Sequence, residues 1–502
     1  MRTRWWVALI WAGFSVRLAF YATAFPLWEG FDEWAHFAVV RHMVDGEGLV
    51  ARNATLPLDV AASLQSAPMP PGIGSADALS HDAFWALPLE ARARREREFR
   101  AIPAESAAKS SGIVAYEALQ PPLYYWLMTP LLWLCRGAQL VTQVFVLRWA
   151  SILIASLIVP TVFLLARAVS KDEQMALGIA AVVSLMPELA ISVARVGNEC
   201  LAVLLYTAVT WLAVGRRNWL ALGIALGLGL ITKAYFLAAV VGAALTFFEP
   251  RAFAVAALLS GWWYVRNVVT TGTLTGLSEA VTLRGISQVS MLSGAAALPW
   301  GKAVDSILFS HLYFGGWSSL TVRSWMYHLL YLVILVAAIG LIELRRNREI
   351  RSLLWIYGVF WLAQLYNVIL IYRSKGVPTS MGWYLYAVVG AQVALAVSGL
   401  RRIVGGHAVG LGVVLFGLLD LYAMHAIALP FYAGMLARKG NGALAGLRLS
   451  GFQPGALFER LTVFKPPIVT EGVMIGLWVG YVIATVMLMV MGVRIGMRIK
   501  RS

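Results

Sequence analysis

Charged residues are scarce in this 502-residue chain. They make up 13% of it, whereas an average soluble domain carries about 25%. Hydrophobic residues make up 60%, tryptophan occurs 20 times and the mean hydropathy is +0.73. A water-soluble globule is therefore excluded. Because apolar stretches close to membrane-spanning length recur from Trp5 to Gly492, the sequence predicts an all-α polytopic membrane protein whose partner is the lipid bilayer.

Cysteine and the common nucleotide-binding motifs are also lacking. The only two cysteines, Cys135 and Cys200, stand in apolar stretches, which excludes a disulfide framework and a cysteine-rich metal site. The chain contains no phosphate-binding loop, no glycine-rich dinucleotide fingerprint and no His-Glu-x-x-His motif, so soluble nucleotide chemistry has no support. No internal repeat is visible either, and residues 1–502 are predicted to form a single integral membrane domain.

Twelve apolar segments are expected to cross the membrane. They cover residues 5–25, 145–167, 174–194, 200–214, 219–233, 235–248, 252–268, 327–344, 352–372, 383–400, 408–429 and 472–493. The first has a basic head and no clear cleavage site, so it is predicted to be a retained signal-anchor helix. Another apolar stretch, residues 121–135, is short and contains three prolines, and its length alone does not decide whether it crosses.

The distribution of basic residues decides the question of residues 121–135. The net charge of +16 would suggest a nucleic-acid partner in a soluble protein, but here it reflects membrane orientation and no nucleic acid is expected. If residues 121–135 do not cross, every strong basic cluster in a short loop faces the cytoplasm. These clusters are Arg167 with Lys171, Arg216 with Arg217, Arg251, Arg345 to Arg351, Arg401 with Arg402, and the tail Arg494, Arg498, Lys500 and Arg501. Residues 121–135 are therefore predicted to form a half-buried juxtamembrane helix.

The same topology leaves three large extracytoplasmic loops, in which further juxtamembrane helices are expected. They cover residues 26–144, 269–326 and 430–471, and two short outer loops lie near 195–199 and 373–382. The protein is expected in the inner (plasma) membrane, with its active site on the extracytoplasmic side.

Residues 31–36 (FDEWAH), directly after the first span, form the strongest candidate site. If they open a helix, Asp32 and His36 lie one turn apart on the same face. A partly desolvated carboxylate beside Trp34 and the lipid boundary has raised basicity, which suits a general base. Glu33 stands beside it. The alternative is that Asp32 only caps a surface helix.

A second polar group lies between two spans, on the same side as Asp32. It contains Asn198 and Glu199. Two carboxylates, Asp32 and Glu199, could bind a divalent cation or position a hydroxyl group. The alternative is a solvated turn between helices.

Basic groups at span ends complete the set of candidates. Lys233 stands between two segments so short that they resemble a broken helix, where an ionisable group is costly and a functional role is expected. Arg266 follows two tryptophans and a tyrosine and could bind a phosphate bidentately, although these residues also suit an interface anchor. Snorkelling to the interface is the alternative for Lys233. His311 is a weaker candidate in the second large loop.

Taken in order, these signals resemble the polytopic membrane glycosyltransferases of the GT-C type, a superfamily that includes protein O-mannosyltransferases and the lipid A aminoarabinose transferase. The matching pieces are Asp32, Glu33 and His36, residues 120–125 (QPPLYY), Arg148, Asn198 with Glu199, residues 229–233 (GLITK) and residues 261–267 (GWWYVRN). The resemblance implies transfer of a sugar from a polyprenyl-phosphate donor to an acceptor hydroxyl on the extracytoplasmic face, with inversion, as part of glycan biosynthesis in the cell envelope.

The resemblance also implies roles for residues. Asp32, with Glu33 beside it, takes the place of the catalytic base, and His36, Asn198, Glu199 and His311 take supporting places. Lys233 and Arg266 become candidates for the donor phosphate. A divalent cation is possible, with Asp32 and Glu199 as its ligands. The acceptor is a glycan, a lipid or a protein.

Two other functions stay open. A transporter or flippase for lipid-linked glycans would place ionisable residues near mid-membrane in repeated helices, whereas here the strongest acids stand at outer ends. A glycan ligase would use the same class of lipid-phosphate donor.

Overall fold

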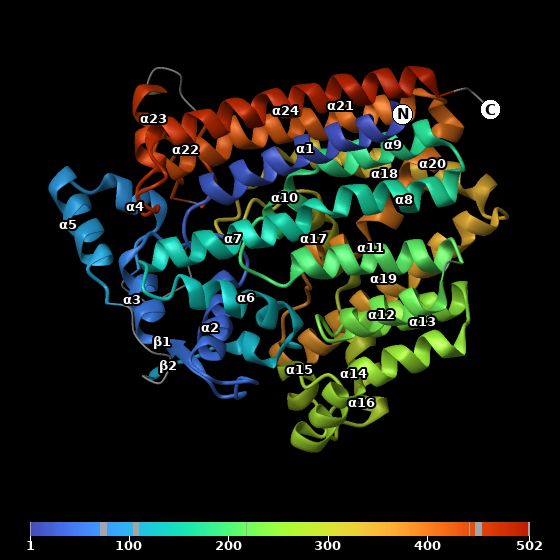
Figure 1. Ribbon diagram of the computed structural model, residues 1–502, viewed down its shortest axis with the longest axis horizontal. Helices are drawn as coiled ribbons and strands as arrows, with labels where there is room; N and C mark the ends of the chain where they lie inside the picture. The colour runs from blue at the N-terminus through green and yellow to red at the C-terminus, as the bar shows by residue number, and fades with distance from the viewer. Residues whose placement is uncertain are drawn as a thin grey trace.

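The computed structural model describes residues 2–70, 78–103, 110–216, 218–440, 442–446 and 454–499. Arg217, Lys500 and Arg501 of the predicted cytoplasmic clusters lie outside these residues. Figure 1 shows a bundle of long helices with shorter helices gathered at one end. The bundle consists of α1 (Arg2–Ala24), α7 (Leu140–Ser156), α8 (Ile158–Ser170), α9 (Glu173–Leu185), α10 (Pro187–Val193), α11 (Glu199–Val214), α12 (Trp219–Leu230), α13 (Phe236–Thr246), α14 (Pro250–Thr271), α18 (Ser324–Leu344), α19 (Arg348–Lys375), η2 (Gly382–Val388), α20 (Val389–Val404), α21 (His407–Tyr422), η3 (Ala423–Ala428), α22 (Leu429–Tyr432) and α24 (Glu471–Arg498).

The loops between these helices carry structure of their own. They contain α2 (Glu33–Val44), α3 (Leu58–Ser66), α4 (His81–Ala86), α5 (Leu89–Arg100), η1 (Tyr116–Leu119), α6 (Leu123–Leu134), α15 (Ser278–Thr282), α16 (Gln288–Ala297), α17 (Trp300–Leu312) and α23 (Pro454–Leu461). Strands β1 (Thr55–Pro57) and β2 (Ser110–Val114) pair antiparallel in a two-stranded sheet.

Eight helical segments among the described residues are long and apolar enough to cross a membrane, so the chain is an all-α, multi-pass membrane protein. They are Thr3–Ala24, Leu140–Ser170, Pro250–Thr271, Ser324–Leu344, Arg348–Lys375, Gly382–Val404, His407–Tyr432 and Glu471–Arg498. A ninth candidate, α9 with α10, bends by 67° at its break. The predicted count of twelve is not confirmed, because α11, α12 and α13 are helices of 16, 12 and 11 residues.

The helix predicted at residues 121–135 is α6, and it is not among the candidate spans of the described chain. It has 12 residues and contains Pro130. Tyr124 and Tyr125 are fully buried, whereas Leu134 on the other side is 74% exposed. α6 therefore buries one side against the protein, and its place at the membrane interface stays a prediction.

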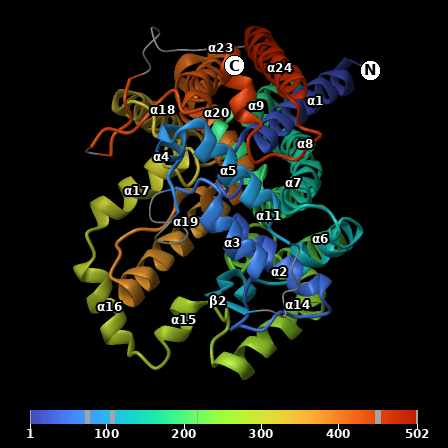
Figure 2. The ribbon, with the colours of Figure 1, turned by 90° about the vertical axis from the view of Figure 1, so that its left-hand side faces the viewer.

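The three predicted outer loops pack against one another. Both chain termini lie toward the right-hand end of Figure 1, and α3, α4, α5 and α23 lie toward the left-hand end, which Figure 2 views face-on. Arg52 of the first loop donates a hydrogen bond to the carbonyl of Gly276 in the second, at 2.6 Å. Ser318 of the second loop bonds the Glu29 carboxylate of the first, and Arg438 of the third donates to the Ser318 carbonyl. These hydrogen bonds join the three loops into one loop layer.

A buried ion pair holds the bundle together at its interior. Arg17 of α1 lies 3.0 Å from the Asp420 carboxylate of α21, and both side chains are 0% exposed. Tyr21 and Tyr481 donate hydrogen bonds to the two Asp420 oxygens, at 2.5 and 2.8 Å. Both carboxylate oxygens are thus engaged, as a buried charge requires. Nothing in the sequence analysis singles out this pair.

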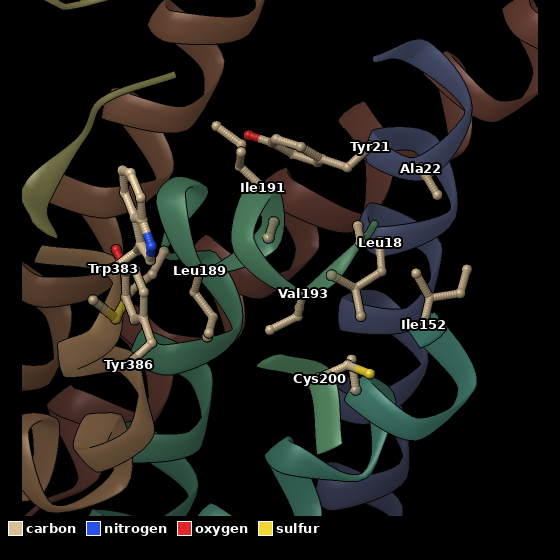
Figure 3. Close-up of a cluster of buried hydrophobic side chains, with 14 of the residues drawn as sticks. Leu18, Tyr21, Ala22, Ile152, Leu189, Ile191, Val193, Cys200, Trp383 and Tyr386 are labelled. Atoms are coloured by element: carbon tan, nitrogen blue, oxygen red, sulfur yellow. The ribbon is translucent and has the colours of Figure 1, made fainter. Parts of the chain in front are cut away.

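An apolar core connects α1 to the segments that carry the polar candidates. Figure 3 shows side chains that come from α1, α7, α10, α11 and η2, and the labelled ones are Leu18, Tyr21, Ala22, Ile152, Leu189, Ile191, Val193, Cys200, Trp383 and Tyr386. The packed interior leaves little room for these segments to shift. The core therefore fixes the turn at 195–199 and the start of η2 relative to the end of α1.

The sidedness of the loop layer can be tested by cysteine labelling. Arg94 lies on α5 with a side chain that is 71% exposed, and Arg346 is exposed between α18 and α19. In a background in which Cys135 and Cys200 are replaced by serine, a membrane-impermeant maleimide should label Arg94→Cys on intact cells and Arg346→Cys only after permeabilisation, because basic clusters stay cytoplasmic. The reverse pattern would invert the topology.

Candidate functional site

Asp32 has an unusual backbone conformation for a residue with a side chain. It stands at the N-cap of α2 with φ 58° and ψ 17°, in the left-handed region, which aspartate tolerates better than most residues. Its side chain makes no capping hydrogen bond. Instead, the hydroxyl of Tyr116 in η1 donates to Oδ1 at 2.7 Å, and the side chain stays partly exposed. The capping interpretation therefore lacks its hydrogen bond, and the carboxylate remains available to a second molecule.

Glu33, the neighbouring acid, is held in a buried ion pair. Arg148 of α7 donates to both of its oxygens, Nε to Oε1 at 2.7 Å and Nη2 to Oε2 at 2.6 Å. The backbone N–H of Val196 also donates to Oε1, at 3.0 Å. The same guanidinium reaches the carbonyls of Ala22, Phe25 and Pro26 at the end of α1. Because its oxygens are occupied, Glu33 positions the loop after α1, and Asp32 is the more accessible of the two acids.

The predicted QPPLYY segment joins α2 to the polar turn at 195–199. The Tyr125 hydroxyl lies 2.8 Å from His36 Nδ1, and the Tyr124 hydroxyl accepts the Gly197 N–H at 2.9 Å. His36 is 2% exposed. Burial, together with the charges of Arg195 and Lys233, lowers the pKa of His36 well below its ordinary value. His36 is thus a neutral side chain that supports the site.

The second acid and the predicted broken helix come together in space. Lys233 stands in the break between α12 and α13 and donates to Glu199 Oε1. The Tyr235 hydroxyl donates to Glu199 Oε2 at 3.1 Å. Asn198 donates its side-chain amide to the carbonyl of Thr232, at 3.3 Å. The turn at 195–199 and the break at 231–235 are therefore one polar assembly.

Glu117 of η1 is a further acid that the sequence analysis missed. Burial and the charge of Asp32 raise the pKa of the Glu117 carboxyl from 4.5 to about 8, against the opposing charges of Lys233 and Arg195. Its Oε2 lies 3.6 Å from His36 Nδ1. In the sequence, only its position just before the QPPLYY segment could have pointed to Glu117. In the structure, η1 lies beside Asp32.

Arg195 is a second missed residue. Its guanidinium lies over the ring of Phe31, 5.3 Å from the centroid, and its Nε donates to the carbonyl of Ser192 at 2.9 Å. The buried Nη1 has no hydrogen-bond partner among the described residues. An arginine N–H without an acceptor is costly to bury, so this group is suited to an incoming anion.

Aromatic rings from η2 form another side of the site. Trp383 stacks on Phe31 with 3.8 Å between ring centroids, and Lys233 Nζ lies 5.1 Å from the ring centroid of Tyr384. His311 of α17 holds this segment: its Nδ1 lies 3.1 Å from the Gly382 carbonyl, and its own carbonyl accepts from the Tyr386 hydroxyl at 2.6 Å. Burial lowers the pKa of His311 to about 4. His311 therefore acts through η2, as a neutral positioning residue.

Arg266 lies in a different environment from Lys233. Its guanidinium is 5.0 Å from the ring centroid of Trp263 on the same helix. Burial and the charge of Arg266 both lower the pKa of Arg52, so the two arginines lie near each other. Trp262 stacks on Trp126 of α6 at 6.0 Å. Arg266 thus belongs to a group of arginine and tryptophan side chains toward the C-terminal end of α14.

The predicted divalent-cation pair does not fit the arrangement of donors. The Glu199 carboxylate is engaged by Lys233 and Tyr235. Within the described parts of the chain, no group of three or more His, Cys, Asp or Glu side chains is arranged to hold a metal ion. Because both Glu199 oxygens are bonded, Asp32 and Glu199 do not form an open pair of carboxylates for a metal ion in this arrangement.

Comparison with protein-family models, with curated proteins and with solved structures finds no match to this chain.

The raised pKa of Glu117 predicts a dependence of stability on pH. Between pH 4.5 and about 8 the folded state holds a proton on Glu117 that the unfolded state has lost. The free energy of unfolding contributed by this group therefore falls as the pH rises through that range. Glu117→Gln removes this titrating group. Between about pH 5 and pH 8, the interval between the two pKa values, the thermal midpoint of the variant in detergent should therefore fall less than that of the wild type. Equal slopes would contradict the raised pKa.

Proposed function

We propose that the chain is a GT-C type membrane glycosyltransferase, which moves a sugar from a polyprenyl-phosphate donor to an acceptor hydroxyl with inversion. The observation that carries this proposal is the Asp32 carboxylate: it is partly exposed, makes no capping hydrogen bond, and follows Phe31, whose ring lies against the buried Arg195 guanidinium. A general base needs an accessible carboxylate. A phosphorylated donor needs cations beside it.

The transfer is a single displacement. The acceptor oxygen forms a bond to the anomeric carbon while its proton passes to an oxygen of Asp32. The bond between the anomeric carbon and the phosphate oxygen breaks, and its electron pair leaves with the polyprenyl phosphate. The Tyr116 hydroxyl, which donates to Oδ1, holds the carboxylate in place and leaves Oδ2 to accept the proton.

The phosphate charge that develops during this displacement requires donors. Arg195 offers the unpaired Nη1, and Lys233 offers an ammonium that Glu199 holds in position. In this proposal Arg266, in its group of arginine and tryptophan side chains, binds the donor phosphate before it reaches the inner group. The protein works in the plasma membrane with its site on the extracytoplasmic side, and a glycan, a lipid or a protein supplies the hydroxyl.

The alternative function is transport of lipid-linked glycans, which would depend on ionisable side chains near the middle of the membrane. The ion pair of Arg17 and Asp420 is such a charge, but both Asp420 oxygens are bonded by neighbouring side chains. A saturated pair favours an anchoring role over a transport role. A glycan ligase would share the donor chemistry and differ only in the size of the transferred glycan.

Donor binding tests the proposal through Arg266. Charge-assisted hydrogen bonds contribute roughly 1.5 to 3 kcal/mol, so Arg266→Ala should weaken the binding of a polyprenyl-phosphate sugar about tenfold to a hundredfold. Titration of the purified protein in detergent measures this effect.

Arg251→Ala is the matched control for this titration. Arg251 stands near the other end of α14 and also lies over a tryptophan ring, at 5.0 Å from Trp219, but it pairs with Glu249. Its substitution should leave donor affinity unchanged. Wild-type protein that binds no polyprenyl-phosphate sugar would refute the proposed function, and an unaffected Arg266→Ala would make Arg266 a plain interface anchor.

A further inference from the structure

A pocket lies apart from the Asp32 cluster, where the end of α1 meets the first and third loops. Its volume is about 390 Å³ when its open mouth is included, and α4, α23 and the turn before α24 contribute to its wall. Apolar side chains, among them Leu27, Phe84 and Phe464, make up most of this wall. The polar groups at the pocket are His81, Arg460 and Lys465. The site is therefore an open, mostly apolar recess with cationic side chains at its wall.

Lys465 is the side chain that points to a ligand. It is 5% exposed and its ammonium donates to the carbonyl of Phe25. That carbonyl also accepts from Arg148. Lys465 forms no salt bridge with a carboxylate in the described parts of the chain, although an ammonium has three N–H donors and is costly to bury without a counter-charge. Burial and the charge of Arg148 lower its pKa well below the ordinary value, against the opposing charge of Glu33, whose two oxygens are already bonded by Arg148. An anion beside Lys465 would supply the missing counter-charge.

The other polar groups of the pocket also provide no free acid to pair with its cations. Arg460 lies over the ring of Trp85, 5.2 Å from the centroid, and donates one hydrogen bond to the carbonyl of Ala433. His81 is 3% exposed, and its Nε2 lies 3.4 Å from Glu29, whose oxygens also accept from the backbone and side chain of Ser318. Glu29 is thus already bonded. Two cations at the pocket, Arg460 and Lys465, remain without an acid of their own in the described chain.

We propose that this pocket binds the phosphate group of a lipid, with Lys465 and Arg460 on the phosphate and the apolar wall along the lipid chain. α1 ends at Ala24 and α24 begins at Glu471, so the pocket lies at the level where two spans meet the loop layer. Lipid phosphates occupy this level of a bilayer. Lysine and arginine are the side chains suited to phosphate. A free phosphate shares this chemistry, and the experiment separates the two sources.

The test is a binding titration on the purified full-length protein in neutral detergent. The probes are inorganic phosphate, a short-chain phosphatidic acid and the diacylglycerol that lacks its phosphate. The wild type should bind the phosphatidic acid saturably, bind inorganic phosphate more weakly and show no competition by the diacylglycerol. Lys465→Met and Arg460→Gln should each raise the dissociation constant for phosphatidic acid about tenfold or more.

Controls keep the test independent of folding. Lys465→Arg retains the charge and should retain binding, and Arg94→Gln, on the exposed face of α5, should bind as the wild type does. If Lys465→Met does not fold, Arg460→Gln decides. Wild-type affinity in both charge-removing variants, or no saturable binding of either phosphate probe, would overturn the proposal. Equal affinity for inorganic phosphate and phosphatidic acid would overturn the lipid part and leave a free-phosphate site. Sugar transfer does not enter this assay, so its outcome is independent of the proposed function.

Discussion

Asp32→Asn is expected to lower the rate of sugar transfer by about 10² to 10⁴ while leaving the protein folded and able to bind donor. Asparagine keeps the size of the side chain and tolerates the left-handed backbone that residue 32 adopts. It cannot take the proton of the acceptor hydroxyl. A reconstituted transfer assay with a polyprenyl-phosphate sugar, together with donor titration, measures both quantities.

Asp45→Asn is the matched control, because Asp45 is exposed at the other end of the same helix α2. It should transfer sugar at the wild-type rate. Turnover of Asp32→Asn within a few fold of the wild type would remove Asp32 from the mechanism. A loss of donor binding in the same variant would instead place Asp32 in the binding of substrate.

Breaking the ion pair of Glu33 and Arg148 is expected to cost about 3 to 5 kcal/mol of unfolding free energy. Their side chains are 0% and 5% exposed, so Glu33→Gln leaves a buried guanidinium without its counter-charge. Chemical unfolding in detergent measures this loss. If the variant is still folded, its transfer rate per folded molecule should stay far above that of Asp32→Asn.

Two further variants calibrate this measurement. Glu98→Gln breaks an exposed pair with Arg94 on α5, where the nitrogen and oxygen are 3.8 Å apart, and should cost less than about 1 kcal/mol. The double variant Glu33→Gln/Arg148→Met should recover part of the loss, because it removes the unpaired charge. A stable but inactive Glu33→Gln would make Glu33 a participant in proton transfer.

The long helices could be predicted from the sequence because each carries its own signal. A run such as residues 327–344 is apolar over a membrane-spanning length wherever it lies, and α18 matches it. The predicted spans at 174–194 and 235–248 are not confirmed as single straight spans. Their composition is equally apolar, but α9 and α10 bend at Pro187 and α13 has 11 residues, and neither the angle nor the length of a packed helix is set by composition.

Some residues of the site could also be recognised from the sequence, whereas others matter only through contacts that form when the chain folds. Asp32, Glu199 and Lys233 could be singled out because charged residues are rare in an apolar chain and are therefore easy to recognise in the sequence alone. Their partners could not. Glu117 and Arg195 matter through burial and through neighbours far away in the sequence, and these properties exist only once α2, η1 and α11 have packed together.

The ion pair between Arg17 and Asp420 imposes a delay on the assembly of this protein. Arg17 belongs to α1, and Asp420 belongs to α21, which is synthesised much later. At a synthesis rate of about 5 to 20 residues per second, Arg17 waits on the order of 20 to 80 seconds for its partner. During that interval α1 carries an uncompensated charge at membrane depth, so it must stay beside the insertion machinery, water or lipid phosphates. Although α1 is synthesised long before α21, it therefore reaches its final place only after α21 has been made.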